Sequence, residues 1–423
     1  TSAELASGWP MQGGIYIWVK EAFGKRMGFL AIWLQWISNV IWYPAILQFV
    51  GGTIGFLIAP SLINDTHFLW LVIVGTFWAI TFINCYGMKI SAFFATLCTL
   101  SGLLLPMTCI ITLGALWVID GNPLQIQLDS SHIKPVLNNP GLWTSLTAVM
   151  LSFCGIEIAT VHANDVINPQ RAFPKALAYS VLMIVSTLIL GSLAIAVVLP
   201  VQDINLVAGI MQTVQVILAR YHLLSLMPAM AFMLVLGALG SVNNWIIAPT
   251  KGLLIAAQDG NLPFFLQRIN AAGAPVTMLI MQALIVTGFA TMILYFPSVN
   301  GAYWFLTSLA AQLYMLMYAL MFITVFKLRR SAPDQSRAFC VPGGKWGLGL
   351  IAFMGIIGVG TTFGVSFLPP PGIDVGDVRQ YTLLLSLGLI VMCVLPFAMA
   401  FIEERCKRCN LLTYLARTIL IVK

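Results

Sequence analysis

Charged residues are scarce in this 423-residue sequence: they make up 8% of the chain, while 60% is hydrophobic. A soluble domain carries roughly a quarter charged residues. Because so few charges cannot cover the surface of a soluble protein of this length, the sequence predicts an integral membrane protein.

The common local patterns of enzymes and ATP-driven pumps are also missing. The sequence has no His-Glu-x-x-His, no Gly-x-Ser-x-Gly and no Gly-x4-Gly-Lys-Ser/Thr segment. It shows no repeated filter segment of the kind that channels use. We therefore expect neither an enzyme nor a channel, and no cofactor.

Cysteines are few and scattered, and most lie in apolar runs where the thiol packs as a small hydrophobic group. Only Cys406 and Cys409 have the spacing of a metal-binding pair. Without a second pair or nearby histidines this spacing is weak evidence for zinc. No metal site is expected.

Long apolar runs are what the sequence has in abundance. Ten have about the 20 residues that cross a bilayer, and in lipid such segments should be helices. They lie at 28–58, 68–86, 90–119, 142–163, 174–200, 224–256, 275–297, 302–327, 347–368 and 380–402. The linkers are too short to be domains, so residues 1–423 are expected to form one transmembrane domain, all α-helical.

Basic residues fall on one side of these spans. Of the 21 Lys and Arg residues, all but Lys134, Arg220 and Arg379 lie on the side that also holds both chain ends. This bias predicts that side to be cytoplasmic, including a tail at 403–423, and it explains the basic excess without nucleic acid. The apolar segment 204–219 would invert the later loops if it spanned, so we expect an amphipathic helix on the outer surface.

Glu157 is the one acidic residue well inside a predicted span. A carboxylate there is costly unless it meets a partner or a water-filled cavity. It either ties the span to a neighbouring helix or belongs to a substrate or proton site. Gly155 and Ser152 weaken the helix beside it, and a helix break at mid-membrane is tolerated where it lines a cavity. Many secondary transporters build their binding sites at such breaks.

Several motifs resemble the amino acid–polyamine–organocation superfamily, and within it the glutamate/GABA antiporter family. They are GGIYIWVKEAFGKRMGF (13–29), SFCGIEIATVHAND (152–165), HANDVINPQRAFPKA (162–176) and AAQDGNLPFFLQRINAAGAPV (256–276). The resemblance covers nearly the whole chain. It implies a five-plus-five inverted repeat with two further helices, which makes twelve in all. This chain is expected to contain ten of those twelve. The broken first helix is then expected upstream of Thr1.

The resemblance also implies a substrate site. It maps Phe153, Cys154, Gly155 and Glu157 to the broken sixth helix, Asn244 and Trp245 to helix eight, and Tyr314 and Tyr318 to helix ten. The two tyrosines are four residues apart and share a helix face, which suits a polar cavity or an aromatic packing surface. Ser241 departs from the pattern, because an acid is expected one turn before the tryptophan.

The implied function is antiport: a glutamate-like amino acid is exchanged for another amino acid or for a decarboxylated, GABA-like amine. A proton- or sodium-coupled symporter of the same fold remains the alternative. The expected partners are small amino acids and membrane lipid in a bacterial inner membrane. The sequence does not indicate an oligomeric state.

Overall fold

The computed structural model describes residues 1–87, 96–126, 137–200 and 203–421, and within these ranges every regular element is a helix. Ten helical segments of this part are long and apolar enough to cross a membrane, which confirms the ten predicted spans. They are built from α3 (Lys25–Ile58), α4 (Thr66–Cys85), η2 (Leu100–Leu104) with α6 (Leu105–Ile119), α7 (Pro140–Ser152) with η3 (Ile156–Asp165), α8 (Pro169–Ala196), α10 (Met227–Ala256), α11 (Val276–Met292), α12 (Val299–Ser331), α13 (Gly344–Val365) and α14 (Val378–Ile421).

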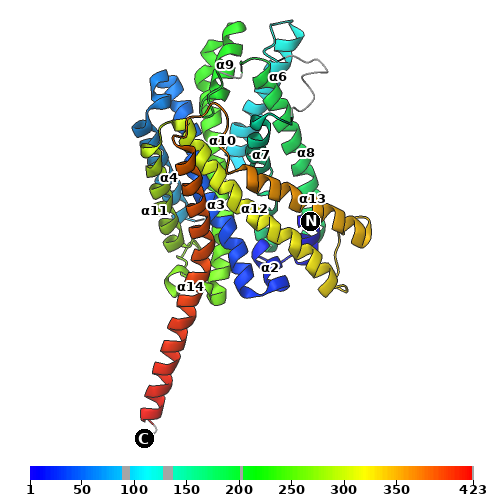
Figure 1. Cartoon of the computed structure of the whole chain (residues 1–423), viewed down its shortest axis with the longest axis vertical. Helices are drawn as coiled ribbons and strands as arrows, with labels where there is room; N and C mark the ends of the chain where they lie inside the picture. Colours follow the sequence, from blue (N-terminus) through cyan, green and yellow to red (C-terminus); the bar gives the residue numbers. More distant parts are fainter. Residues whose placement is uncertain (88–95, 127–136, 201–202, 422–423) are drawn as a thin grey trace.

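Several boundaries differ by a few residues from the sequence prediction, and two of these differences are informative. α8 begins five residues early, at Pro169, because a proline is well placed in the first turn of a helix, where no N–H partner is needed. The backbone of the expected tail is a continuation of α14, which projects beyond the bundle (Figure 1). Residues 90–95 of the third predicted span lie outside the described residues.

Shorter helices connect or flank the spans. The segment 204–219, predicted as an amphipathic helix, contains α9 (Gly209–Arg220), which buries one face against α6 and α10. The others are α1 (Ser2–Gly8), α2 (Ile15–Phe23), η1 (Pro60–Asn64), η5 (Leu224–Leu226), η6 (Ala257–Asn261), η7 (Phe264–Leu266) and η8 (Ile293–Tyr295).

α2 was not predicted, because its nine residues are too few to span and its apolar side is buried by protein. It packs against α3 and α12. Its Tyr16 hydroxyl donates to the Asp259 carboxylate at 2.6 Å, and Lys20 forms an ion pair with the same carboxylate. Burial, together with the bond to Asp259, raises the pKa of Tyr16 well above its usual range, so the hydroxyl remains a donor at physiological pH.

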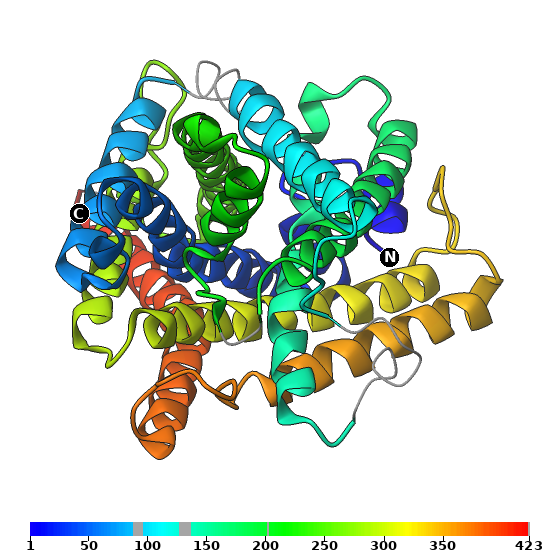
Figure 2. The same ribbon diagram turned by 90° about the horizontal axis from the view of Figure 1, so that it is seen from above.

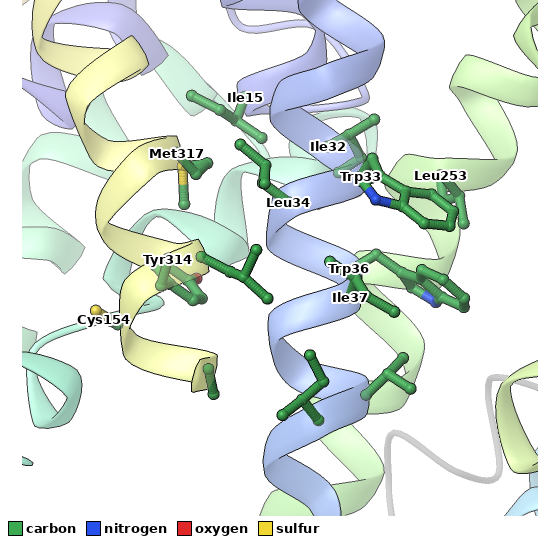
Figure 3. Close-up of a cluster of buried hydrophobic side chains, with 14 of the residues drawn as sticks. Ile15, Ile32, Trp33, Leu34, Trp36, Ile37, Cys154, Leu253, Tyr314 and Met317 are labelled. Carbon is green, nitrogen blue, oxygen red and sulfur yellow. The ribbon is translucent and has the colours of Figure 1, made fainter. Parts of the chain in front are cut away.

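α3 forms the centre of the bundle, where it packs against α10 and α12 (Figure 2). Most of its side chains are buried, as expected for a helix surrounded by others. Figure 3 shows Leu34 on the side facing Met317 of α12, while Trp33 and Trp36 lie on the other side of the helix. The Trp36 indole also donates to Gln282 on α11 at 2.7 Å. This helix therefore fixes the positions of the elements that build the site.

The outermost helices expose apolar side chains. Leu182 on α8, Phe353 on α13 and Leu387 on α14 are all exposed. In water such surfaces would be costly, but a bilayer accepts them. The chain is therefore a multi-pass integral membrane protein.

Candidate functional site

The predicted break lies between α7 and η3. α7 ends at Ser152, a turn follows, and the narrower helix η3 begins at Ile156. Gly155 has a φ of 91°, which L side chains rarely adopt. Its N–H donates to the Tyr318 hydroxyl of α12 at 3.0 Å, so a group freed by the break has a side-chain partner.

Close packing also requires the glycine at this turn. The Trp245 indole of α10 lies directly against Gly155, and a Cβ at that position would overlap the ring. The break and the tryptophan, which the family resemblance had placed at one site, are therefore in contact.

Glu157 lies at the centre of a hydrogen-bond cluster and is 2% exposed. Gln35 Nε2 and the Tyr314 hydroxyl each donate to its Oε1 at 2.8 Å, and the Tyr318 hydroxyl donates to its Oε2 at 2.8 Å. These bonds tie η3 to α3 and α12. The sequence left two interpretations of Glu157 open, a link to a neighbouring helix or a substrate or proton site. The observed hydrogen bonds form such a link.

The two tyrosines also pack on each other. Their ring centroids are 5.2 Å apart with planes at 79°, an edge-to-face arrangement. Tyr314 and Tyr318 thus combine the two interpretations that the sequence allowed, since the rings pack together while the hydroxyls bond to Glu157.

A cavity of about 200 Å³ lies beside this cluster. Helices α3, α7, α10 and α12 and the turn at Cys154 supply its walls. The lining residues are Ser38, Asn39, Trp42, Ala148, Leu151, Ser152, Cys154, Trp245, Tyr303, Thr307, Ala310 and Tyr314. None of these described residues carries a formal charge, so neutral polar groups and aromatic rings surround any occupant.

The predicted site residues divide into three groups around this cavity. Cys154, Trp245 and Tyr314 line it. Gly155, Glu157 and Tyr318 lie in the adjoining cluster, and Phe153 is the half-buried first residue of the turn. Tyr314 connects the two, because its side chain lines the cavity and its hydroxyl donates to Glu157.

Asn244 does not line the cavity. Its side chain is exposed, whereas the adjacent Asn243 is buried and accepts a hydrogen bond from Asn84 of α4 at 2.7 Å. Neighbouring residues on a helix point about 100° apart, and here Asn243 faces the protein interior while Asn244 does not.

α3 contributes residues that were not predicted for the site. Gln35 bonds to Glu157, and Ser38, Asn39 and Trp42 line the cavity. Their spacing of three, four and seven residues from Gln35 places them on one helix face. Polar residues at this spacing within an apolar span were the sequence signal that could have predicted this part of the site.

Trp245 is held from α3 as well. The Tyr43 hydroxyl donates to the Trp245 carbonyl oxygen at 2.8 Å, and the ring centroids of Trp42 and Trp245 lie 5.9 Å apart.

Within the described residues no group of three His, Cys, Asp or Glu side chains is arranged to hold a metal ion. Cys406 and Cys409 lie outside the residues whose side chains are described.

A helical bundle with an interrupted helix beside a central, partly polar cavity has the architecture of a secondary membrane transporter. Comparison with known proteins specifies the family. The chain belongs to the amino acid permease family, whose sequence profile matches residues 1–395. It is therefore a transporter and not an enzyme.

Individual relatives agree with this assignment. An uncharacterized transporter of Legionella pneumophila is 42% identical, covering 96% of this chain and 88% of that protein. A glutamate/gamma-aminobutyrate antiporter of Lactococcus lactis is 29% identical, covering 96% of this chain and 81% of that protein. A probable agmatine/putrescine antiporter of the same species is 22% identical, covering 81% and 72%.

Proposed function

We propose that this protein is an amino acid antiporter that exchanges a glutamate-like amino acid for another amino acid or for its decarboxylated amine. The observation that carries the proposal is the cavity bounded by the Cys154 turn, Trp245 and Tyr314, next to the buried Glu157 cluster. The name of the Lactococcus glutamate/gamma-aminobutyrate antiporter supports the exchange of an amino acid for its decarboxylated product.

The cavity suits a small molecule that has polar ends and an apolar middle. Ser38, Asn39 and Thr307 offer neutral hydrogen-bonding groups, and Trp42 and Trp245 offer aromatic surface. The broken helix borders the cavity at Ser152 and Cys154, and such breaks form part of the substrate sites of many secondary transporters. Glu157 is not a lining residue, so we assign it to holding η3 on α3 and α12.

Exchange follows if the loaded site opens alternately to each side of the membrane. The Glu157 bonds join three elements in the present conformation, so their rearrangement is coupled to opening. A counter-substrate lets the loaded protein return, and the gradient of one substrate drives the other without ATP.

Transport by the full-length protein in liposomes tests this proposal. Uptake of labelled glutamate should rise at least tenfold when the liposomes contain unlabelled glutamate or GABA. It should be unaffected by a sodium gradient. Rapid uptake into empty liposomes that follows an imposed sodium or proton gradient would instead establish the symporter alternative.

A further inference from the structure

A basic, aromatic groove lies where α12 ends and α13 begins, apart from the central cavity. It has a volume of about 360 Å³ and is lined by Phe326, Arg329, Arg330, Lys345, Trp346, Leu348 and Gly349. We propose that this groove binds the phosphate headgroup of an anionic phospholipid, with the acyl chains lying along α13.

The charges in the groove favour an anion. Arg329 is already engaged, since its guanidinium forms an ion pair with the buried Glu4. Arg330 and Lys345 are exposed, and no carboxylate in the described part of the chain pairs with either. Two positive charges therefore remain available to a ligand.

Aromatic packing positions one of these charges. The Arg330 Cζ lies over the Phe326 ring, 4.2 Å from its centroid, in a cation–π contact. A guanidinium can present two parallel N–H donors to phosphate oxygens, which suits an anionic headgroup. Lys345 adds a mobile ammonium from the first turn of α13.

An apolar stripe continues from the groove along α13. Trp346 is 91% exposed, and Leu350, Phe353 and Ile357 are 61%, 62% and 51% exposed. They follow Trp346 by four, seven and eleven residues, so they share one helix face. Tryptophan is typical of the level where headgroups meet acyl chains. Cations above and an apolar stripe below match the two parts of a phospholipid, whereas free phosphate would use only the cations.

The protein itself fixes the shape of the groove. Figures 1 and 2 show α12 and α13 side by side at the periphery of the bundle. Arg329 Nη1 donates to the Gly344 carbonyl oxygen at 2.8 Å, which joins the end of α12 to the start of α13. The Glu4 carboxylate also accepts the Val341 N–H at 2.9 Å and so secures the connecting segment. Basic pockets between membrane helices are a general form of anionic lipid site.

Native mass spectrometry of the full-length protein in detergent tests the proposal. The protein is titrated with phosphatidylglycerol, and in parallel with phosphatidylcholine of the same chain length. Binding of phosphatidylglycerol should be tighter. The double substitution Arg330→Gln/Lys345→Gln should weaken it by about fivefold for each cation removed, the usual strength of a basic side chain at an anionic lipid surface.

The matched control is Lys25→Gln/Lys175→Gln, which removes two exposed cations from other elements and should leave binding unchanged. Trp346→Ala should weaken both lipids alike, because it removes apolar contact but no charge. Equal phosphatidylglycerol affinity in the two double variants would overturn the proposal, as would equal binding of the two lipids by the unsubstituted protein.

Two further results would replace the proposal with another occupant. Displacement of phosphatidylglycerol by millimolar inorganic phosphate would identify a free-anion site. A dimer that is lost in Trp346→Ala and unaffected by lipid would identify a second copy of this chain.

Discussion

Gly155 is the residue on which the local geometry of the site most depends. Gly155→Ala would place a Cβ in the Trp245 ring and force a side chain into a left-handed backbone conformation. We expect a loss of about 1–3 kcal/mol of stability and a large loss of transport. Thermal unfolding in detergent and liposome exchange measure the two effects.

Gly273→Ala separates the two causes. Gly273 has a φ of 77°, but nothing lies within 4 Å of its Cβ position, so its substitution adds backbone strain without a clash. If both variants lose the same stability, contact with Trp245 contributes nothing.

Glu157→Gln tests the hydrogen-bond cluster. The glutamine amide has one acceptor oxygen where the carboxylate has two. It therefore cannot accept all three hydrogen bonds from Gln35, Tyr314 and Tyr318 in the present arrangement. We expect the protein to insert normally but to exchange substrate at least tenfold more slowly, or with an altered pH dependence. Exchange rates between pH 5 and 8 provide the measurement, and size-exclusion chromatography checks folding.

Tyr318→Phe is the companion variant, because it removes one donor to Glu157 and the acceptor for the Gly155 N–H while keeping the ring. A smaller loss than that of Glu157→Gln is expected. Exchange at the normal rate and pH profile in both variants would show that the cluster has no part in transport.

The sequence predicted the unusual residues of the site better than the ordinary ones. Glu157 stood out because an acid within an apolar span needs a reason, and Gly155 because glycine weakens a helix. Gln35 and Asn39 did not stand out, because burying an amide within a membrane span costs less free energy than burying a charge. Asn244 lies outside the cavity lining, which the sequence did not show because an apolar helix does not indicate which of two adjacent residues faces inward.

At the scale of elements, two glycines allow a close approach of η2 and α10. Gly102 of η2 and Gly237 of α10 face each other, and a Cβ on either would overlap the main chain of the other. Small residues allow this approach between helices in membranes. Gly237→Ala should destabilise the protein by about 1–3 kcal/mol, seen as a lower unfolding temperature in detergent.

Gly75→Ala on α4 is the matched control, because its Cβ would meet nothing within 4 Å. An equal change in unfolding temperature for the two variants would mean that the crossing is loose.

The ten spans were predictable because length and apolarity suffice to identify a membrane helix. α2 and the turn after α7 were harder to place. The apolar side of α2 is covered by α3 and α12, and the end of α7 depends on contacts from α10 and α12. Both are set by tertiary packing, which composition does not reveal.

At the scale of the whole molecule, orientation in the membrane follows from the basic residues. Cys340 and Asp374 lie beyond opposite ends of α13, and both are exposed. We predict that Cys340 faces the cytoplasm and Asp374 the outside, because the basic side chains gather at the first end. With Cys340 as the single cysteine, an impermeant maleimide should label only permeabilised cells.

The reciprocal variant carries Asp374→Cys in a background without other cysteines. It should be labelled in intact cells. Labelling of Cys340 in intact cells, with protection at position 374, would reverse the orientation.

The uncharged lining of the central cavity has a kinetic consequence. A fixed charge would neutralise one end of a substrate and hold it for a long time, as tight binding sites do. Side-chain dipoles and aromatic faces hold a substrate more loosely, so its residence time is short. A carrier has to release on one side what it binds on the other, and a shallow energy well serves this purpose better than a deep one. If the proposed substrate binds here, we therefore expect the cavity to favour rapid turnover over tight affinity.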